Sequence, residues 1–319
     1  MQTTDNTLIL GIDLGGTNTV FGIVDSDGKI FCRGHIPTNG HLTFDEFISS
    51  LHSAVADSMR DSGLDFSQLR AIGIGAPCIN PQTGVIEGAV NLPWPSPIHL
   101  TEELSKRFGI PAFGENDANA AAIGEMHFGA GRGLDNFIMI TLGTGVGGAV
   151  ICDGRLLHGK RGLAAELGHI PIVHASEARQ CNCGRKGCLD AYATARGIVA
   201  TAKDLLNESS AESLLRNLPD FDARTIGEAA ATGDRIALET FRITGELLGR
   251  ACADFTAFSS PEAFIFFGGI TGSFHLMHDA IIKAFNENLL WVYEGQVDFR
   301  QSLLPQSDAA ILGAAALAL

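Results

Sequence analysis

Hydrophobic and polar positions alternate in two similar stretches of the chain, and each stretch predicts a meander of three short strands. In the first, two apolar runs flank the glycine pair Gly15-Gly16, and an Asp-Gly turn follows at 27–28. The second stretch, 137–157, repeats this order around a glycine loop at 143–145. Short apolar runs bounded by turn residues are typical of β-strands. The repeat predicts two related domains with a cleft between them, a common location for a ligand.

Helical and strand patterns alternate in the rest of the chain. Apolar residues recur at helical spacing over 44–60, and the segments 118–128 and 222–258 also predict helices. The run at 263–269 predicts a late buried strand, and the small residues of 308–319 predict a helix that packs closely on another element. We therefore expect an α/β fold.

The chain is acidic. Its 319 residues include 22 Lys and Arg against 36 Asp and Glu, a formal net charge of −14. Such a charge disfavours nucleic acid and anionic membranes as partners, so an anionic ligand needs a local site. No apolar run reaches the roughly 18 residues of a membrane-spanning helix, and the polar start MQTTDNT predicts no signal peptide. Seven cysteines, an odd number, favour a reducing cytoplasm over a disulfide scaffold.

Both glycine loops have two interpretations. The chain has no GxxxxGK[ST] motif, which excludes a P-loop site. Residues 143–148 match GxGxxG, but the following AVIC predicts a strand instead of the helix that a dinucleotide site requires. The loops are either ordinary hairpin turns or two phosphate-binding loops, in which backbone N–H groups and the hydroxyls of Thr17 and Thr144 donate to one polyphosphate. Their matching places in the repeat favour phosphate binding.

Two carboxylates stand at the ends of predicted strands. Asp117, in Glu115-Asn116-Asp117, precedes a predicted helix, whose positive end would keep a carboxylate ionised. Asp117 is either a general base that accepts a hydroxyl proton during phosphoryl transfer or a plain helix cap. Asp13 follows the first strand, beside the first glycine loop. There it either holds Mg²⁺ through water or caps the turn.

Three of the cysteines stand close together after a histidine. His169, Cys181, Cys183 and Cys188 follow the spacing H-x11-C-x-C-x4-C. Three thiolates and one imidazole form a complete tetrahedral ligand set for structural zinc. A nucleophilic cysteine gives no reason for three thiols, and a redox pair usually has the spacing C-x-x-C. The spacing therefore predicts a structural zinc site.

Five motifs in this order carry a resemblance to a known family: LGIDLGGTN, ENDANAAA, TLGTGVGG, ELGH and CxCGxxGCLD. They resemble the ROK family of repressors and sugar kinases, and the glucokinase-like members above all. The resemblance implies the actin-like, ribonuclease H-like ATPase fold, with two α/β domains around a central cleft that binds ATP and sugar. We expect 1–117 with 305–319 to form the first domain, and 118–304 to form a larger second domain with the zinc-binding loop. ROK repressors carry a DNA-binding segment before the first strand, so this chain resembles the enzymes.

The resemblance also implies roles for individual residues. Asp117 matches the catalytic base, which removes the proton from the sugar's C6 hydroxyl. The expected sugar ligands are Asn91, Asn116, Glu166, His169 and Asp190, and His169 is also a zinc ligand. The expected ATP and phosphate ligands, with Asp13 on the Mg²⁺ side, are Asp13, Gly15, Gly16, Thr17, Asn18, Gly143, Thr144 and Gly145. Gly268 and Gly269 are expected beside the adenosine. Trp94, in NLPW, is expected either to help close the sugar pocket or to fold into the core.

Two departures from the family pattern concern the choice of sugar. Asp190 stands where the family usually has Glu, and its carboxylate reaches about 1.5 Å less far. The loop GAPCIN at 75–80 replaces a longer GxPGxVD pattern, and we expect Cys78 to be a small buried residue. Glucose is the expected substrate. The alternatives are fructose, N-acetylmannosamine or N-acetylglucosamine, or a sugar-sensing protein without catalysis. We expect a homodimer or homotetramer, as is common in the family.

Overall fold

The computed structural model describes residues 7–89, 91–160, 162–305 and 307–319, and it divides into two compact units. The first unit contains residues up to Gly133, the short segment His158–Leu163 and the C-terminal Leu303–Leu319. The second contains Leu134–Leu157 and Ala164–Ser302. Each unit has its own five-stranded sheet and its own hydrophobic core. The predicted α/β fold with two similar parts is confirmed.

The first sheet begins with the predicted meander. Its strand order is β3-β2-β1-β4-β8, where β1 pairs antiparallel with β2 and parallel with β4. The strands are β1 (Leu8–Leu14), β2 (Asn18–Val24), β3 (Ile30–Pro37), β4 (Leu69–Gly75) and β8 (Ala112–Glu115). Because β1, β4 and β8 are parallel, their carboxyl ends lie at one edge of the sheet. A small three-stranded sheet follows β4, formed by β5 (Ile79–Asn80), β6 (Val85–Ile86) and β7 (Ile98–His99).

Helices α1 (Phe44–Asp61) and α2 (Leu100–Phe108) pack on the first sheet and contribute to its core. Helix α1 starts at a capping box, in which the Thr43 hydroxyl accepts the N–H of Glu46 and the Glu46 carboxylate accepts the N–H of Thr43. The box satisfies donors that a helix start otherwise leaves unpaired. The apolar positions of α1 recur every three or four residues, so one face of the helix is buried.

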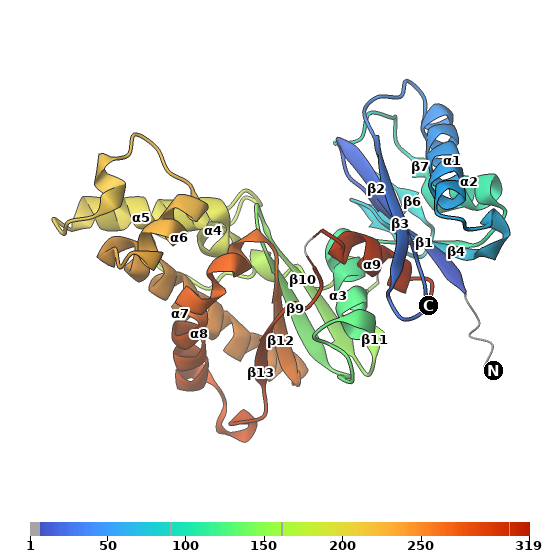
Figure 1. Cartoon of the computed structure of the whole chain (residues 1–319). Helices are drawn as coiled ribbons and strands as arrows, with labels where there is room; N and C mark the ends of the chain where they lie inside the picture. Colours follow the sequence, from blue (N-terminus) through green and yellow to red (C-terminus); the bar gives the residue numbers. More distant parts are fainter. Residues whose placement is uncertain (1–6, 90, 161, 306) are drawn as a thin grey trace. The chain divides into compact units, whose positions relative to one another are not determined.

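Helix α9 (Ala309–Ala316) lies against a row of paired glycines in the first sheet. A Cβ on Gly11 would lie 2.3 Å from the Ile311 oxygen, and one on Gly73 would lie 1.8 Å from the Ala314 oxygen. Only glycine permits this approach of helix to sheet. Figure 1 shows α9, in red, beside the blue strands of the first unit. The close packing predicted for the small-residue helix is confirmed.

Helix α3 (Asp117–Phe128) follows β8 and crosses α9 at another glycine contact. A Cβ on Gly124 would lie 2.8 Å from the Cα of Gly313. This packing assigns α3 to the first unit, whereas the sequence placed 118–128 in the second domain. The unit boundary lies instead at 133/134, and the second unit ends at Ser302.

The second sheet repeats the first in order and direction. Its order is β11-β10-β9-β12-β13, with an antiparallel meander and two parallel strands beside it. The strands are β9 (Phe137–Leu142), β10 (Val146–Cys152), β11 (Arg155–Leu156), β12 (Ala263–Phe267) and β13 (Asp298–Gln301). Strand β13 was not predicted, because its sequence DFRQ contains no apolar run.

Helices and short 3₁₀ turns complete the second unit, and α7 and α8 pack extensively on each other. The helices are α4 (Asp190–Ala193), α5 (Ala195–Glu208), α6 (Ala223–Ala231), α7 (Arg235–Ser259) and α8 (Phe274–Asn288). The 3₁₀ turns of the chain are η1 (Phe66–Gln68), η2 (Leu167–His169), η3 (Leu214–Asn217), η4 (Gly269–Ser273) and η5 (Trp291–Tyr293). The helix predicted over 222–258 is two helices, because Gly233 turns the chain with a φ of 90° and Asp234 caps α7.

The burial expected for Cys78 from the sequence is wrong. Cys78 is exposed, and its φ is 55°, in the left-handed region that favours glycine. The resembling family usually has glycine at this place. Separately, no helix within the described ranges has the length and apolar character needed to cross a membrane.

Candidate active site

The start of α3 brings the predicted base into a defined turn. The side chain of Asn116 caps the helix by accepting the N–H groups of Ala118 and Asn119, at 2.9 and 3.4 Å. Asp117 is the first residue of the helix, where the aligned peptide dipoles favour a negative charge. The cap is therefore Asn116, which leaves the Asp117 carboxylate available for chemistry.

Asp13 lies at the same edge of the first sheet. It stands near the end of β1 in register with Gly75, the last residue of β4, and Gly75 pairs in turn with Glu115. Burial, and after it the negative charge of Asp117, raises the pKa of Asp13 to about 6 from its ordinary 3.8. The structure thus brings the two predicted carboxylates within electrostatic range of each other. A pair of acids whose charges repel is suited to hold a divalent cation.

The first glycine loop joins β1 to β2 and borders a polar pocket. The N–H of Gly15 donates to the Asn18 oxygen at 3.1 Å and closes the loop. The pocket has a volume of about 560 Å³ and is lined by Gly16, Thr17, Asn39, Asn91, Leu92 and Pro93. A Cβ on Gly16 would lie 2.8 Å from the Asn91 oxygen, so the approach of the Asn91 loop requires glycine. The structure brings the predicted phosphate loop and Asn91 together.

Asn39 is a pocket residue that sequence reasoning missed. It follows β3 in an exposed turn, and its TNG sequence is that of many ordinary turns. Trp94 lies outside the described lining of this pocket. It is 5% exposed, and its ring lies 4.7 Å from that of Phe47 and 5.2 Å from that of Phe44. Trp94 therefore belongs to the core of the first unit.

The second glycine loop joins β9 to β10 and borders a larger pocket in the second unit. The N–H of Gly143 donates to the Gly145 oxygen at 3.0 Å, and the chain continues as strand β10. This strand excludes the dinucleotide site, which requires a helix there. Gly268 has a φ of 109°, and a Cβ on it would lie 2.4 Å from the Leu142 oxygen. The turn after β12 therefore depends on glycine.

The larger pocket has a volume of about 610 Å³. Its lining includes the predicted Gly143 and Gly269 together with an apolar wall that contains Ala223, Phe241 and Ile270. The other lining residues were missed by the sequence analysis: Ala195, Asp222, Arg224, Gly227, Glu228, Ala231, Gly272, Ser273 and His275. They come from segments far apart in the sequence, so no local pattern marks them. A lining that combines apolar and polar side chains suits a flat heterocycle with a polar tail.

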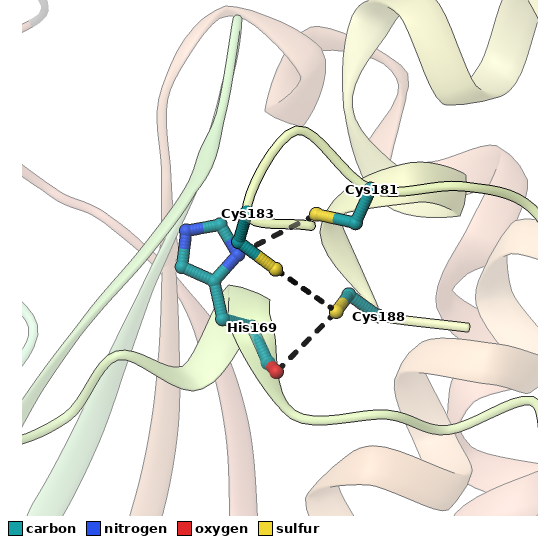
Figure 2. A group of neighbouring side chains, drawn as sticks. All are labelled: His169, Cys181, Cys183 and Cys188. Carbon is teal, nitrogen blue, oxygen red and sulfur yellow. Dashed lines mark hydrogen bonds between the residues drawn. The ribbon is translucent and has the colours of Figure 1, made fainter. Parts of the chain in front are cut away.

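The four predicted metal ligands converge in the second unit (Figure 2). Their ligand atoms all lie within 4.8 Å of one another; His169 Nδ1 is 3.6 Å from Cys181 Sγ, and Cys183 Sγ is 3.6 Å from Cys188 Sγ. A tetrahedral zinc ion with Zn–S bonds of about 2.3 Å separates its sulfurs by about 3.8 Å. The side chains therefore fit a tetrahedral metal ion. All seven cysteines are free thiols, so no disulfide competes for the cluster.

Two thiols of the cluster have opposite pKa shifts. The backbone N–H of Arg185 is the largest of the influences that lower the pKa of Cys183, to about 6. Burial raises the pKa of Cys188 to about 12. A metal ion binds thiolates, so binding at this cluster must release the Cys188 proton.

Two of the remaining predicted sugar ligands, Glu166 and His169, lie at η2, which packs on β10, and the third, Asp190, begins α4. Glu166 precedes η2 and makes no side-chain cap to it, whereas His169 ends it. Asp190 is 7% exposed, and its carboxylate accepts the N–H of Val146 at 2.9 Å. Asp190 therefore holds the strand that follows the second glycine loop. The predicted residues fall into two sets, and each unit contains one set.

Comparisons of the sequence and of the structure with known proteins point to the same family. The ROK family model matches residues 9–319. A glucokinase of Thermotoga maritima is 35% identical over 316 residues, which cover 97% of this chain and 96% of the relative. An N-acetylmannosamine kinase of Salmonella typhi is 29% identical over 316 residues, 97% of each chain. A ROK family glucokinase from Streptomyces griseus, solved in complex with glucose and AMPPNP, matches with a TM-score of 0.74 at 35% identity and covers 97% of this chain and 98% of its own. The chain belongs to the ROK family and has its actin-like, ribonuclease H-like ATPase fold.

Proposed function

We propose that this protein is an ATP-dependent hexose kinase that phosphorylates glucose at its 6-hydroxyl. The observation that carries the proposal is the turn at Asn116-Asp117. The helix start holds the Asp117 carboxylate next to a cap that leaves it free, and Asp13 lies within electrostatic range. The glucokinase relatives and the solved complex with glucose and AMPPNP support the same activity.

The proposed reaction assigns one step to each group. The Asp117 carboxylate accepts the C6 hydroxyl proton as the oxygen attacks the γ-phosphorus, and the bond to the ADP oxygen breaks. Asn91, Asn116, Glu166, His169 and Asp190 orient the sugar. The loop residues Gly15, Gly16, Thr17, Asn18, Gly143, Thr144 and Gly145 hold the phosphates, and Gly268 and Gly269 border the adenosine. Mg²⁺ would neutralise phosphate charge, and we assign Asp13 to hold it.

The metal cluster has a structural role in this proposal. We assign zinc to His169, Cys181, Cys183 and Cys188, because three thiolates and an imidazole are its preferred closed ligand set. His169 would bind the metal through Nδ1, which lies 3.6 Å from Cys181 Sγ, and Nε2 would remain for a sugar hydroxyl. The bound metal would fix the loop between Glu166 and Asp190 and would take no part in the proton transfer.

A coupled assay of ADP formation over about ten hexoses tests the function. We expect the highest kcat/KM on glucose and no turnover without Mg²⁺. Asp117→Ala should remove turnover while the melting temperature stays close to that of the wild type. Near-normal turnover by this variant would contradict the mechanism, and an inactive wild type would favour a sugar-sensing protein.

A second candidate is phosphorylation of N-acetylmannosamine. The relative in Salmonella typhi supports it. The same panel decides, because pocket differences of one methylene change selectivity by about 1–3 kcal/mol. A higher kcat/KM on N-acetylmannosamine than on glucose would replace the first proposal.

A further inference from the structure

The carboxylate of Glu115 organises the turn before Asp117. Glu115 is the last residue of β8, and its side chain is 4% exposed. Its Oε1 accepts the N–H of Asn116 at 2.9 Å and the side-chain amide of Asn119 at 3.0 Å. The carboxylate therefore fixes residues on both sides of Asp117.

His158 binds the second oxygen of this carboxylate. Its Nε2 lies 2.6 Å from Glu115 Oε2. The tautomer of His158 that carries its proton on Nε2 donates to this carboxylate oxygen. With His158 in place, both oxygens of the buried carboxylate have partners. A buried carboxylate that lacks one of its donors is free to rotate or take up water.

The backbone around this contact is held from several sides. The N–H of Ala76 donates to the Glu115 oxygen at 2.9 Å, which fixes β8 against the end of β4. His158 begins the short segment that belongs to the first unit although it is flanked by the second in sequence. Within that segment Gly162 packs on Pro81, where a Cβ would lie 2.9 Å from the proline ring. His158 thus reaches Glu115 from a segment with its own support.

We propose that His158 and Glu115 are positioning residues for phosphoryl transfer. The imidazole orients the Glu115 carboxylate, the carboxylate fixes Asn116 and Asn119, and these residues set the direction of the Asp117 side chain. The inference rests on the proposed function, because it gives Asp117 the role of base. It adds two residues that touch neither sugar nor nucleotide.

Steady-state kinetics of His158→Ala and His158→Gln on the preferred sugar test the proposal. A misplaced base lowers the rate of the chemical step, and displacements of about 1 Å can change rates by about 100-fold. We expect His158→Ala to lower kcat by about 10- to 100-fold with the KM for ATP within about twofold. Glutamine places an amide N–H near the position of Nε2, so His158→Gln should recover most of kcat. A kcat for His158→Ala within about twofold of the wild type, or equal losses in both variants, would overturn the proposal.

Two further measurements distinguish a failure of this proposal from a failure of the proposed kinase function. His99→Ala is a matched control. His99 is the last residue of β7, and its Nδ1 lies 3.5 Å from the carboxylate of Glu102 in an exposed pair, so the variant should keep full activity. Amide hydrogen exchange of peptides covering 116–121 needs no turnover. It should be faster in His158→Ala than in the wild type, and unchanged exchange would overturn the proposal. If no hexose is phosphorylated by the wild type, the proposed function fails while the exchange result still decides whether His158 fixes the turn.

Discussion

The two five-stranded sheets share strand order and direction but differ at the ends of their strands. In the first sheet, β1 carries Asp13, whose burial raises its pKa to about 6. In the second, the repeat places Thr141 at the matching position of β9, and its hydroxyl accepts the N–H of Gly147 at 3.1 Å. One copy therefore presents acids at the sheet edge, and the other uses the same position to close its own hairpin. The repeat supplies the backbone, and single side chains divide the chemistry between the copies.

The two glycine loops differ in the same way. The first spans four residues between Leu14 and Thr19, which pair across the hairpin, whereas the second spans three between Leu142 and Val146. The first is packed against the Asn91 loop. The second faces open space at Gly143, where nothing lies within 4 Å of an added Cβ. The same motif is thus partly structural in one unit and open to a ligand in the other.

The largest expected effect is on kcat, and it should differ between substitutions at the starts of α3 and α9, the helices that follow the fifth strand of each sheet. Asp117→Asn removes the general base at the start of α3 and should lower kcat by about 10²- to 10⁴-fold. Asp308 precedes α9 and pairs with Arg33 at 2.6 Å. Asp308→Asn should keep kcat within about twofold. Equal losses in the two variants, measured by the coupled assay, would show that helix starts in general and not the acid at α3 control turnover.

Metal removal should affect the units unequally. Among the described residues, one group of three or more His, Cys, Asp or Glu side chains is arranged to hold a metal ion: His169, Cys181, Cys183 and Cys188, in the second unit. At a free metal concentration about 1,000 times its Kd, bound metal stabilises a fold by about 4 kcal/mol. Removal of the proposed zinc ion, or Cys188→Ser, should therefore destabilise the second unit by a similar amount. Hydrogen exchange should rise in 164–208 and change little in β1–β4; a uniform rise would contradict the local role.

Asp13 should lower the stability of the first unit at neutral pH. Because its folded pKa is raised to about 6 from 3.8, the proton binds more tightly in the folded state. The contribution of the protonated Asp13 to the stability of the folded state is fully present below pH 3.8 and is lost as the pH rises through about 6. Asp13→Asn should thus stabilise the protein at pH 8 by about 1–3 kcal/mol, since one pKa unit is worth about 1.4 kcal/mol.

Urea unfolding of Asp13→Asn at pH 4 and pH 8 in Mg²⁺-free buffer measures this effect. The stabilisation should be absent at pH 4, and the variant should also lose activity. In an Asp117→Asn background the gain at pH 8 should shrink, because one of the two causes of the shift is gone. A gain that is equal at both pH values would contradict the electrostatic explanation.

Substitutions in the two loops should give opposite results. Gly143→Ala places its methyl in open space, so its melting temperature should match that of the wild type while the KM for ATP rises by about tenfold. Gly16→Ala meets the Asn91 oxygen at 2.8 Å and should lower stability by about 1–3 kcal/mol. An unchanged KM for ATP in Gly143→Ala would remove the second loop from the phosphate site.

The smallest expected effects concern one strained residue in each unit. Cys78 and Ala165 have φ values of 55° and 64°, which cost a residue with a Cβ about 1–2 kcal/mol. Glycine relieves this strain but gains entropy in the unfolded chain, so Cys78→Gly and Ala165→Gly should each stabilise by at most about 1 kcal/mol. Urea midpoints measure the change, and a clear loss in either variant would show that its side chain makes compensating contacts.

Local patterns predicted the two meanders, the grouping of the histidine with three cysteines and the place of Asp117 at a helix start, because each depends on residues close together in the sequence. The wall of the larger pocket was not predictable, since Asp222, Phe241 and His275 meet only in the folded unit. The unit boundary was missed because α3 is assigned by its contact with α9, almost 200 residues later in the chain. The contact between His158 and Glu115 likewise joins two segments that no periodicity connects.

The glycine row beneath α9 affects the order in which the first unit can fold during synthesis. Strands that carry Asp13 and precede Asp117 leave the ribosome early, but the surface formed by Gly11, Gly22 and Gly73 is covered only by residues 309–316. Domains generally fold as units during synthesis, from the N-terminus onward. The first unit therefore completes its packing only after residues 309–316 have been synthesised.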